Sequence, residues 1–154
     1  MGGIVGGMTE GTESKATGNI FKIVNCDNVG DSSNKFHITN GAYATFHVGG
    51  IIGQTFSHFD ADDCSNSMDY LFDADKAATT NMWGGLCARI AQVVKVTGRT
   101  TTIDNFTNTG NATITPKTSI AGFDVYSGFL SYMAVDGMDQ SVVANNIVNR
   151  GNIN

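Results

Sequence analysis

The carboxylates of the stretch FDADDCSNSMD, residues 59–69, are the side chains of this sequence best suited to holding a metal ion. Asp60, Asp62 and Asp63 offer clustered oxygen ligands of the kind that Ca²⁺ takes. Their spacing differs from that of an EF-hand loop, and the sequence contains no calcium-binding nonapeptide repeat. These three residues are therefore candidates for a Ca²⁺ site, with a solvated face or hydrogen bonds at a corner as the alternative.

Two further carboxylates, Asp31 and Asp69, occupy equivalent positions of a repeated motif. Two carboxylates stacked on neighbouring repeats would repel each other and could share a proton, and paired carboxylates also carry out glycoside hydrolysis. With Arg89 or Lys95 nearby, an aspartate-rich face would suit an enzyme that degrades polysaccharides. The alternative is that both carboxylates accept hydrogen bonds within turns.

The cysteines and histidines do not form a recognisable catalytic or metal-binding pattern. His37, His47 and His58 lack spacings such as HExxH. No histidine lies within the motifs that contain Cys26 and Cys64, so neither thiol has a base to activate it. A disulfide between these two cysteines is geometrically open. The sequence predicts no catalytic residues and no cofactor, and therefore a protein that is not an enzyme.

The composition excludes some partners. The chain has 154 residues, a formal net charge of −5 and only 9 lysines and arginines, which are scattered. We therefore expect no nucleic-acid partner. No apolar run approaches the ~20 residues that span a bilayer, so we expect no membrane insertion in this segment. With 19 glycines and one proline, the chain favours short strands joined by tight turns.

The polar residues belong to a heptad that occurs four times, with the pattern [Asn/Asp]-apolar-x-Asn-x-Gly-[Asp/Asn]. Met68 replaces the glycine in the second copy. The copies occupy residues 25–31, 63–69, 105–111 and 146–152. The fourth position is always asparagine: Asn28, Asn66, Asn108 and Asn149.

A glycine motif precedes each heptad. Its copies are GGIVGGM, GGIIGQT, GGLCARI and SGFLSYM, at residues 2–8, 49–55, 84–90 and 127–133. Residues 1–154 thus form a single repeat domain of four units, about 2–48, 49–83, 84–126 and 127–154. Because the first unit begins directly after Met1, we expect a fragment of a longer protein.

A repeat of about 40 residues without a 3.6-residue apolar spacing favours an all-β parallel β-solenoid of four coils with long loop excursions. Its coils stack ~4.8 Å apart, so like residues lie on like. The four invariant asparagines should form a ladder of side-chain hydrogen bonds. Glycines two residues later should occupy corners with positive φ. These corner glycines are Gly30, Gly110 and Gly151.

Strand alternation divides the glycine motif into an inner and an outer set. The inward column is Ile4, Ile51, Leu86 and Phe129, and the outward apolar column is Val5, Ile52, Cys87 and Leu130. Four stacked apolar residues on the outside would be unusual. Either the connecting segments cover them, or the sheet is buried on both faces.

Several aromatic residues lie in or beside the variable connecting segments: Tyr43, Phe46, Trp83, Tyr126 and Tyr132. Exposed on an extended face, they would suit sugar or protein binding. The alternative is that they pack the connecting segments onto the coils.

The glycine motif followed by N-C-x-N-x-G-[Asp/Asn] resembles the GLUG-type repeats of large surface and secreted proteins of gut-dwelling, Bacteroides-like bacteria. The resemblance extends over essentially the whole chain. It implies a right-handed parallel β-helix in a secreted or surface-attached protein, and it implies no catalytic residues. In units three and four the glycine motif departs from the pattern at Cys87, Ala88, Arg89 and Ser127.

These observations predict a non-catalytic repeat domain at the cell surface or outside the cell, acting as an adhesin-like stalk or a binding platform. Its partner would be a glycan or a host protein. Two alternatives remain: a β-helix enzyme that degrades polysaccharides, and a structural filament that self-associates through its open ends.

Overall fold

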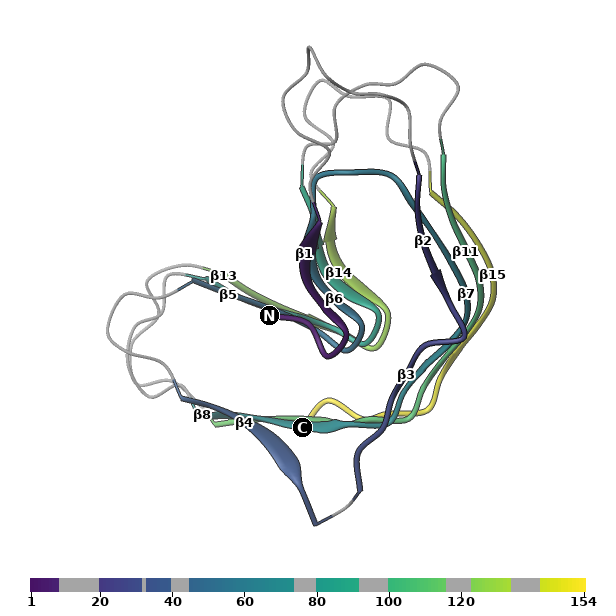
Figure 1. The fold of residues 1–154 in the computed structure, drawn as a ribbon. Helices are drawn as coiled ribbons and strands as arrows, with labels where there is room; N and C mark the ends of the chain where they lie inside the picture. The colour runs from purple at the N-terminus through teal and green to yellow at the C-terminus, as the bar shows by residue number, and fades with distance from the viewer. Residues whose placement is uncertain are drawn as a thin grey trace.

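The computed structural model describes residues 1–8, 20–31, 33–39, 45–73, 80–91, 100–115, 123–133 and 142–154. Within these ranges the chain is all-β, without a helix, and its parallel strands form four stacked sheets (Figure 1). The predicted all-β class and parallel stacking are therefore confirmed.

Each sheet takes one strand from successive repeats. Sheet 1 contains β1 (Val5–Met8), β6 (Ile52–Thr55), β10 (Cys87–Ile90) and β14 (Leu130–Met133). Sheet 2 contains β2 (Phe21–Val24), β3 (Asp27–Asn28), β7 (Phe59–Asn66), β11 (Thr101–Asn108) and β15 (Val142–Asn149). Sheet 3 contains β4 (Lys35–Thr39), β8 (Asp69–Asp73) and β12 (Ala112–Ile114). Sheet 4 contains β5 (Thr45–Gly49), β9 (Thr80–Gly84) and β13 (Phe123–Ser127).

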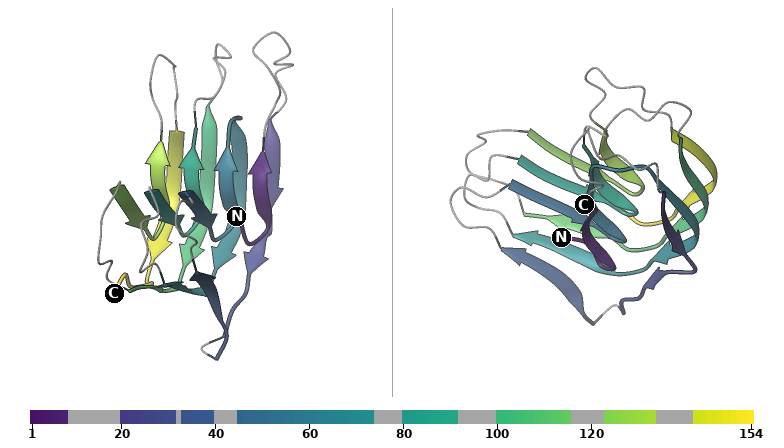
Figure 2. Two further views of the ribbon diagram at one scale, coloured as in Figure 1. Left: turned by 90° about the vertical axis from the view of Figure 1, so that its left-hand side faces the viewer. Right: turned by 45° about the horizontal axis from the view of Figure 1, so that its top comes forward.

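The chain passes through sheets 1, 2, 3 and 4 in that order and then begins again one layer further along the stack (Figure 2). We define layers 1 to 4 as residues 1–49, 50–84, 85–127 and 128–154. Neighbouring strands in every sheet belong to successive layers. The first glycine of each motif is in register with the next, from Gly2 to Gly49 to Gly84, and Ser127 completes the column. Equivalent residues of the repeat therefore lie over one another in successive layers.

Two hydrophobic cores fill the layers. The first core lies between sheets 1 and 2 and contains Ile51, Leu86, Phe59, Ile103 and Phe106, among others. The second core lies between sheets 3 and 4, and half of its buried residues are aromatic. It contains Ile38, Val48, Tyr70, Phe72, Trp83 and Ala112.

The apolar column that alternation directs outward is buried in the two middle layers and half-buried at Val5 and Leu130. Ile52 and Cys87 are 0% and 1% exposed, and they belong to the first core. β6 contacts β5, and β10 contacts β5 and β9, so sheet 4 packs beside this column where the chain turns from one sheet into the other. Sheet 1 is thus covered on both sides at this end, which is the second of the two arrangements that alternation allowed.

The long strands of sheet 2 bend at one residue with left-handed backbone. The first position of each heptad has positive φ: Asn25 (53°), Asp63 (49°), Asn105 (54°) and Asn146 (54°). Asparagine and aspartate tolerate this conformation better than other residues with a Cβ. In β7, Phe59 and Ala61 are buried before the bend, and Cys64 and Asn66 after it. The bend therefore uses one extra residue and keeps the same face inside, as a β-bulge does.

The prediction of positive φ at the corner glycines is wrong, because the φ angles of Gly30, Gly110 and Gly151 lie outside the left-handed region. Glycine is needed there for a different reason. A Cβ at Gly110 would lie 2.8 Å from Asn66 Nδ2, and one at Gly30 would lie 2.6 Å from Met68 Cα. Layers approach so closely at this corner that a side chain would collide with a neighbouring layer.

The predicted stacking of Asp31 on Asp69 is also wrong. Asp69 pairs in register with Lys35, because layer 1 has extra residues between β3 and β4. Asp31 lies in this insertion, where the Ser33 hydroxyl and backbone N–H donate hydrogen bonds to its carboxylate. These bonds lower the pKa of Asp31. The two carboxylates are therefore not a pair that shares a proton.

Candidate functional site

The four invariant asparagines form a continuous chain of side-chain hydrogen bonds through all layers. The Nδ2 atoms of Asn28, Asn66 and Asn108 donate to the Oδ1 atom of the next asparagine, at 2.8, 2.7 and 2.8 Å; the chain ends at Asn149. Asn66 and Asn108 are 1% and 0% exposed. The ladder predicted for this column is thus present, with each amide donating to the following layer.

The ladder lies against the second glycine of each glycine motif, a contact that sequence analysis missed. A Cβ at Gly3, Gly50 or Gly85 would lie 2.5, 2.6 or 2.9 Å from the Cγ atom of the adjacent ladder asparagine. The same contact joins Gly128 to Asn149. The signal was available: this position is glycine in all four units, whereas the first glycine is replaced by Ser127. The two motifs are therefore two halves of one packing contact.

A second ladder follows the seventh position of the heptad through layers 2 to 4. Asp69 accepts hydrogen bonds from the N–H and the Nδ2 of Asn111, both at 2.8 Å, and Asn111 Oδ1 accepts from the Asn152 N–H at 3.0 Å. Asp69 thus serves as a layer-to-layer acceptor. Its carboxylate holds the corner of the next repeat.

The three candidate Ca²⁺ ligands lie on the outer side of β7, and two of them already accept hydrogen bonds from layer 3. Thr102 Oγ1 donates to Asp60, and Asn105 Nδ2 donates to Asp62 at 3.0 Å. Asp63 is exposed at the bend. Among the described residues no group of three histidines, cysteines or acidic residues is placed to hold a metal ion. Ca²⁺ binding at these positions stays a prediction.

The basic residue proposed to act with the aspartates lies on a different sheet. The Arg89 guanidinium, in β10, is 5.9 Å from the centre of the Tyr132 ring. Burial lowers the pKa of the neighbouring His47, and a hydrogen bond with Gln54 opposes that shift, while the charge of Arg89 adds to it. The carboxylates of β7 are in sheet 2, across the first core. Lys95 lies outside the described residues.

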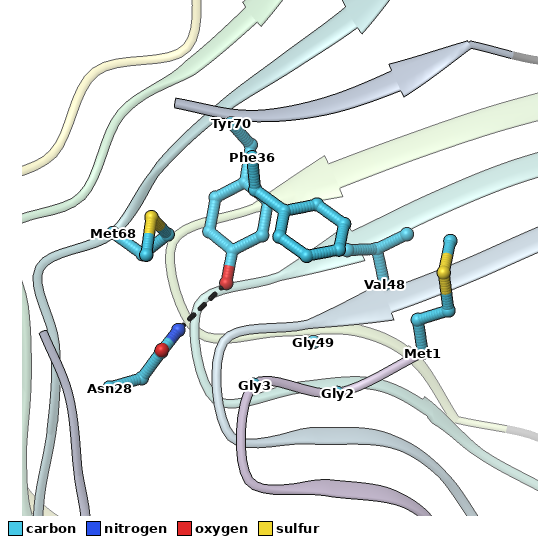
Figure 3. Close-up of a pocket in the computed structure, with 9 residues that line it drawn as sticks. All are labelled: Met1, Gly2, Gly3, Asn28, Phe36, Val48, Gly49, Met68 and Tyr70. Carbon is cyan, nitrogen blue, oxygen red and sulfur yellow. Dashed lines mark hydrogen bonds between the residues drawn. The ribbon is translucent and has the colours of Figure 1, made fainter. Parts of the chain in front are cut away.

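A cavity of about 220 Å³ opens at the layer 1 end of the second core (Figure 3). Tyr70, Phe36 and Val48 are among the residues that line it. The Phe36 ring lies against Tyr70, with ring centres 5.9 Å apart, and Val48 lies beside Phe36. In layer 2 the position of Val48 is taken by Trp83. Its larger ring packs against Tyr70, with the two ring centres 5.6 Å apart. The smaller valine therefore leaves the space. Its only hydrogen bond drawn in Figure 3 runs from Asn28 Nδ2 to the Tyr70 hydroxyl, at 2.9 Å.

Most of the aromatic residues considered for ligand binding pack inside. Trp83 is fully buried, and Phe46 and Tyr126 pack against the second core. Tyr132 is half-buried beside Arg89, and Tyr43 lies outside the described residues. Packing within the layers therefore accounts for Phe46, Trp83 and Tyr126 of sheet 4.

The three cysteines are free thiols. Cys26 and Cys64 occupy one column of the first core, with Phe106 and Ile147 above them. Burial raises the pKa of Cys64, and it raises the pKa of Cys87 to about 12. Both thiols are thus held in the protonated, weakly nucleophilic form.

Comparison with known proteins finds no matching protein-family model, curated protein or solved structure. The GLUG-type resemblance therefore rests on the two motifs alone. In the described part of the chain, no helix has the length and apolar character of a membrane span.

Proposed function

We propose that this chain is a non-catalytic repeat domain of a bacterial surface or secreted protein, and that it serves as a binding platform for a glycan or a host protein. The observation that carries the proposal is the hydrogen-bonded asparagine ladder through all four layers. The residues that recur in the sequence make contacts between layers, so the repetition supports a scaffold. GLUG-type repeats, which the two motifs resemble, suggest the same role and an extracellular location.

The finer fold that we propose is a right-handed parallel β-helix of four coils. Crossovers between parallel strands of one sheet are right-handed in nearly all proteins, and every sheet here is built from such crossovers. The two cores lie between facing sheets, as the inside of a closed coil requires. An experimental structure with left-handed coils would contradict this assignment.

The geometry favours a platform over a simple stalk. Each added layer extends the stack by only ~4.8 Å, although it uses about 40 residues, a typical repeat length. The same number of residues in an extended linker would reach ~120 Å. A long reach would therefore be obtained more simply without a stack, whereas a broad rigid face needs one.

The outer face of sheet 2 is the surface that we expect to bind. Carboxylates, amides and hydroxyls lie there in rows, and hydrogen bonds between layers hold them in place. The side-chain amide of Asn105 donates a hydrogen bond to Asp62 at 3.0 Å, and that of Asn146 donates to Asn105 Oδ1 at 3.0 Å. The side-chain amide of Asn145 donates to Asp104 at 2.8 Å. Preorganised polar groups lose little entropy on binding, and they complement the hydroxyl groups of a sugar chain.

Glycan arrays and pull-downs of host surface proteins, with the 154-residue chain as bait, test the platform directly. We expect a ligand whose binding weakens in Asp62→Ala and is unchanged in Asp31→Ala, since Asp31 lies in a separate turn. Antibody labelling of intact source cells tests the location. Screens that return no ligand would count against a platform, and polysaccharide cleavage that disappears in Asp62→Ala would overturn the non-catalytic assignment.

A further inference from the structure

The exposed apolar residues are concentrated at the two ends of the stack. Eleven large apolar side chains of the described residues are exposed, and only Phe56 lies in a middle layer. Layer 1 contributes Met1, Ile4, Phe21, Val24, Val29 and Phe36. Layer 4 contributes Met133, Val143, Val148 and Ile153. Large apolar groups gathered at two surfaces mark sites of association.

In sheets 1 and 2 the strands at these ends carry few of the charges and prolines that normally prevent edge-to-edge pairing. Natural edge strands carry charges, prolines or bulges that block a second chain. β15 has the sequence VVANNIVN and β14 the sequence LSYM, without a charge or a proline. β1 is also uncharged, and β2 has one charged residue, Lys22. Apart from Lys22 and Asp27 of β3, these edges of sheets 1 and 2 thus carry little charge, and no described residue pairs with their outer backbone groups. The bulge-like bend at Asn146 recurs in every layer, so a further layer can follow it.

The asparagine ladder has complementary ends. No described residue donates a hydrogen bond to Asn28 Oδ1, whose amide nitrogen donates to Asn66 and Tyr70. At the other end, Asn149 Nδ2 makes one long bond of 3.4 Å, to the Gly151 carbonyl. One end of the stack therefore has a free acceptor, and the other has an under-used donor in the same column.

The apolar columns also continue from one end to the other. Ile153 lies in the sheet 3 column of Phe36, Tyr70 and Ala112. A further layer placed against layer 1 would set an isoleucine at the mouth of the cavity beside Phe36. Ile147 would likewise be placed over Cys26, as Phe106 lies over Cys64.

We infer that two copies of this chain associate head to tail, with layer 4 of one copy adding to layer 1 of the next. β14 and β15 would pair in parallel with β1 and β2, in the register that joins successive layers within a copy. Asn149 Nδ2 of one copy would donate to Asn28 Oδ1 of the other. The contact is heterologous, and because it continues the stack along its own axis it repeats without closing and yields filaments. The inference does not depend on the proposed function.

Val143 provides a test of both the contact and its direction. It is 45% exposed, and its column runs through Thr102 and Asp60 to Lys22. A head-to-tail contact places residue 143 of one copy directly opposite Lys22 of the next. Val143→Lys would then create a like-charge pair, and Val143→Asp an opposite-charge pair.

Sedimentation velocity over a range of concentrations at low salt measures the effect. We expect the unmodified chain to form species larger than the 16.2 kDa monomer. Val143→Lys should weaken association and Val143→Asp should strengthen it, so that the two dissociation constants differ by about tenfold, and salt should reduce this difference. Thr109→Lys, which adds the same charge at an exposed site of layer 3, should have no effect. Thermal unfolding of each variant verifies that it is folded.

The other outcomes contradict the inference. A concentration-independent monomer would exclude self-association. Equal weakening by both variants would indicate a contact between two layer 4 ends, and insensitivity to both would place the contact elsewhere.

Discussion

The side chain of Asn66 occupies the space that a Cβ at Gly50 would need, because such an atom would lie only 2.6 Å from Asn66 Cγ. This contact joins the two sequence motifs of the repeat. The glycine lets the chain pass close to the ladder, and each ladder asparagine packs against the glycine turn of its own layer.

Substitution of Gly50 tests this packing. Gly50→Ala would force its Cβ against Asn66 and the backbone of Gly85, and we expect a loss of about 3 kcal/mol in the free energy of unfolding. The control is Gly6→Ala, since a Cβ at Gly6 meets nothing within 4 Å. Urea unfolding of both variants makes the comparison. If they were equally stable, the contact would have no energetic role.

The ladder predicts unequal effects along its length. Asn66→Ala removes two hydrogen bonds and leaves the buried Asn108 Oδ1 unpaired, at a cost of about 2–4 kcal/mol. Asn149→Ala at the exposed end should cost about 1 kcal/mol or less. Urea unfolding measures both. A cost at Asn149 equal to that at Asn66 would contradict a ladder whose strength comes from burial.

Asn66→Asp should make stability depend on pH. The new carboxyl would be buried beside Asn108 Oδ1, so its charged form is disfavoured and its pKa in the folded chain lies above the unfolded value of about 3.9. The variant should therefore be closest to the unmodified chain below pH ~4 and lose stability as pH rises through the folded-state pKa. Unfolding curves at several pH values determine the difference. A gap that widens at low pH would show that the carboxyl is not buried in this way.

The left-handed backbone at the bend predicts which substitutions of Asp63 are tolerated and which destabilise the chain. Asp63 has φ of 49° and an exposed side chain, so Asp63→Gly should be neutral or stabilising. Asp63→Ala should be about 1 kcal/mol less stable than the glycine variant, because alanine is strained in this region. Asp73→Ala, at an exposed strand end, controls for loss of a carboxylate. Equal unfolding midpoints for alanine and glycine at position 63 would argue against positive φ.

The three free thiols should differ in reactivity. Cys64 and Cys87 are buried with raised pKa values, whereas Cys26 is half-buried in layer 1. An aromatic disulfide reagent at neutral pH should therefore modify Cys26 first and the other two only after unfolding. Cys26→Ser should abolish the fast phase. Rapid modification of Cys87 in the folded chain would contradict its burial.

The periodicity of the sequence was sufficient to predict the architecture, because a stack of layers brings equivalent residues of the repeat together. The order of the motifs predicted parallel stacking, and the invariance of Asn28, Asn66, Asn108 and Asn149 predicted their hydrogen bonds. The stacking and the hydrogen bonds are the same in every layer, so each of the four copies of the motif carries the sequence signal for them.

The sequence predictions were wrong where one layer differs from the others, and where two residue types can adopt the same backbone conformation. Four extra residues separate Asn28 from its corner strand in layer 1, compared with layer 2, and no periodic rule shows that Asp31 leaves the column. Positive φ was assigned to glycine because glycine adopts it most easily, but the chain uses Asn25, Asp63, Asn105 and Asn146 instead. The end cavity depends on the difference in volume between Val48 and Trp83, which a repeat pattern does not register.

The single left-handed residue in each long strand sets a parity rule for insertions and deletions. In β7 and β11 the bend already accounts for one residue, and the two arms keep their alternation on either side of it. Adding or removing one residue within an arm would exchange its inner and outer side chains, whereas a change of two would preserve them. Length variants that still fold should therefore change these arms in steps of two, and odd-numbered changes should be confined to the connecting segments.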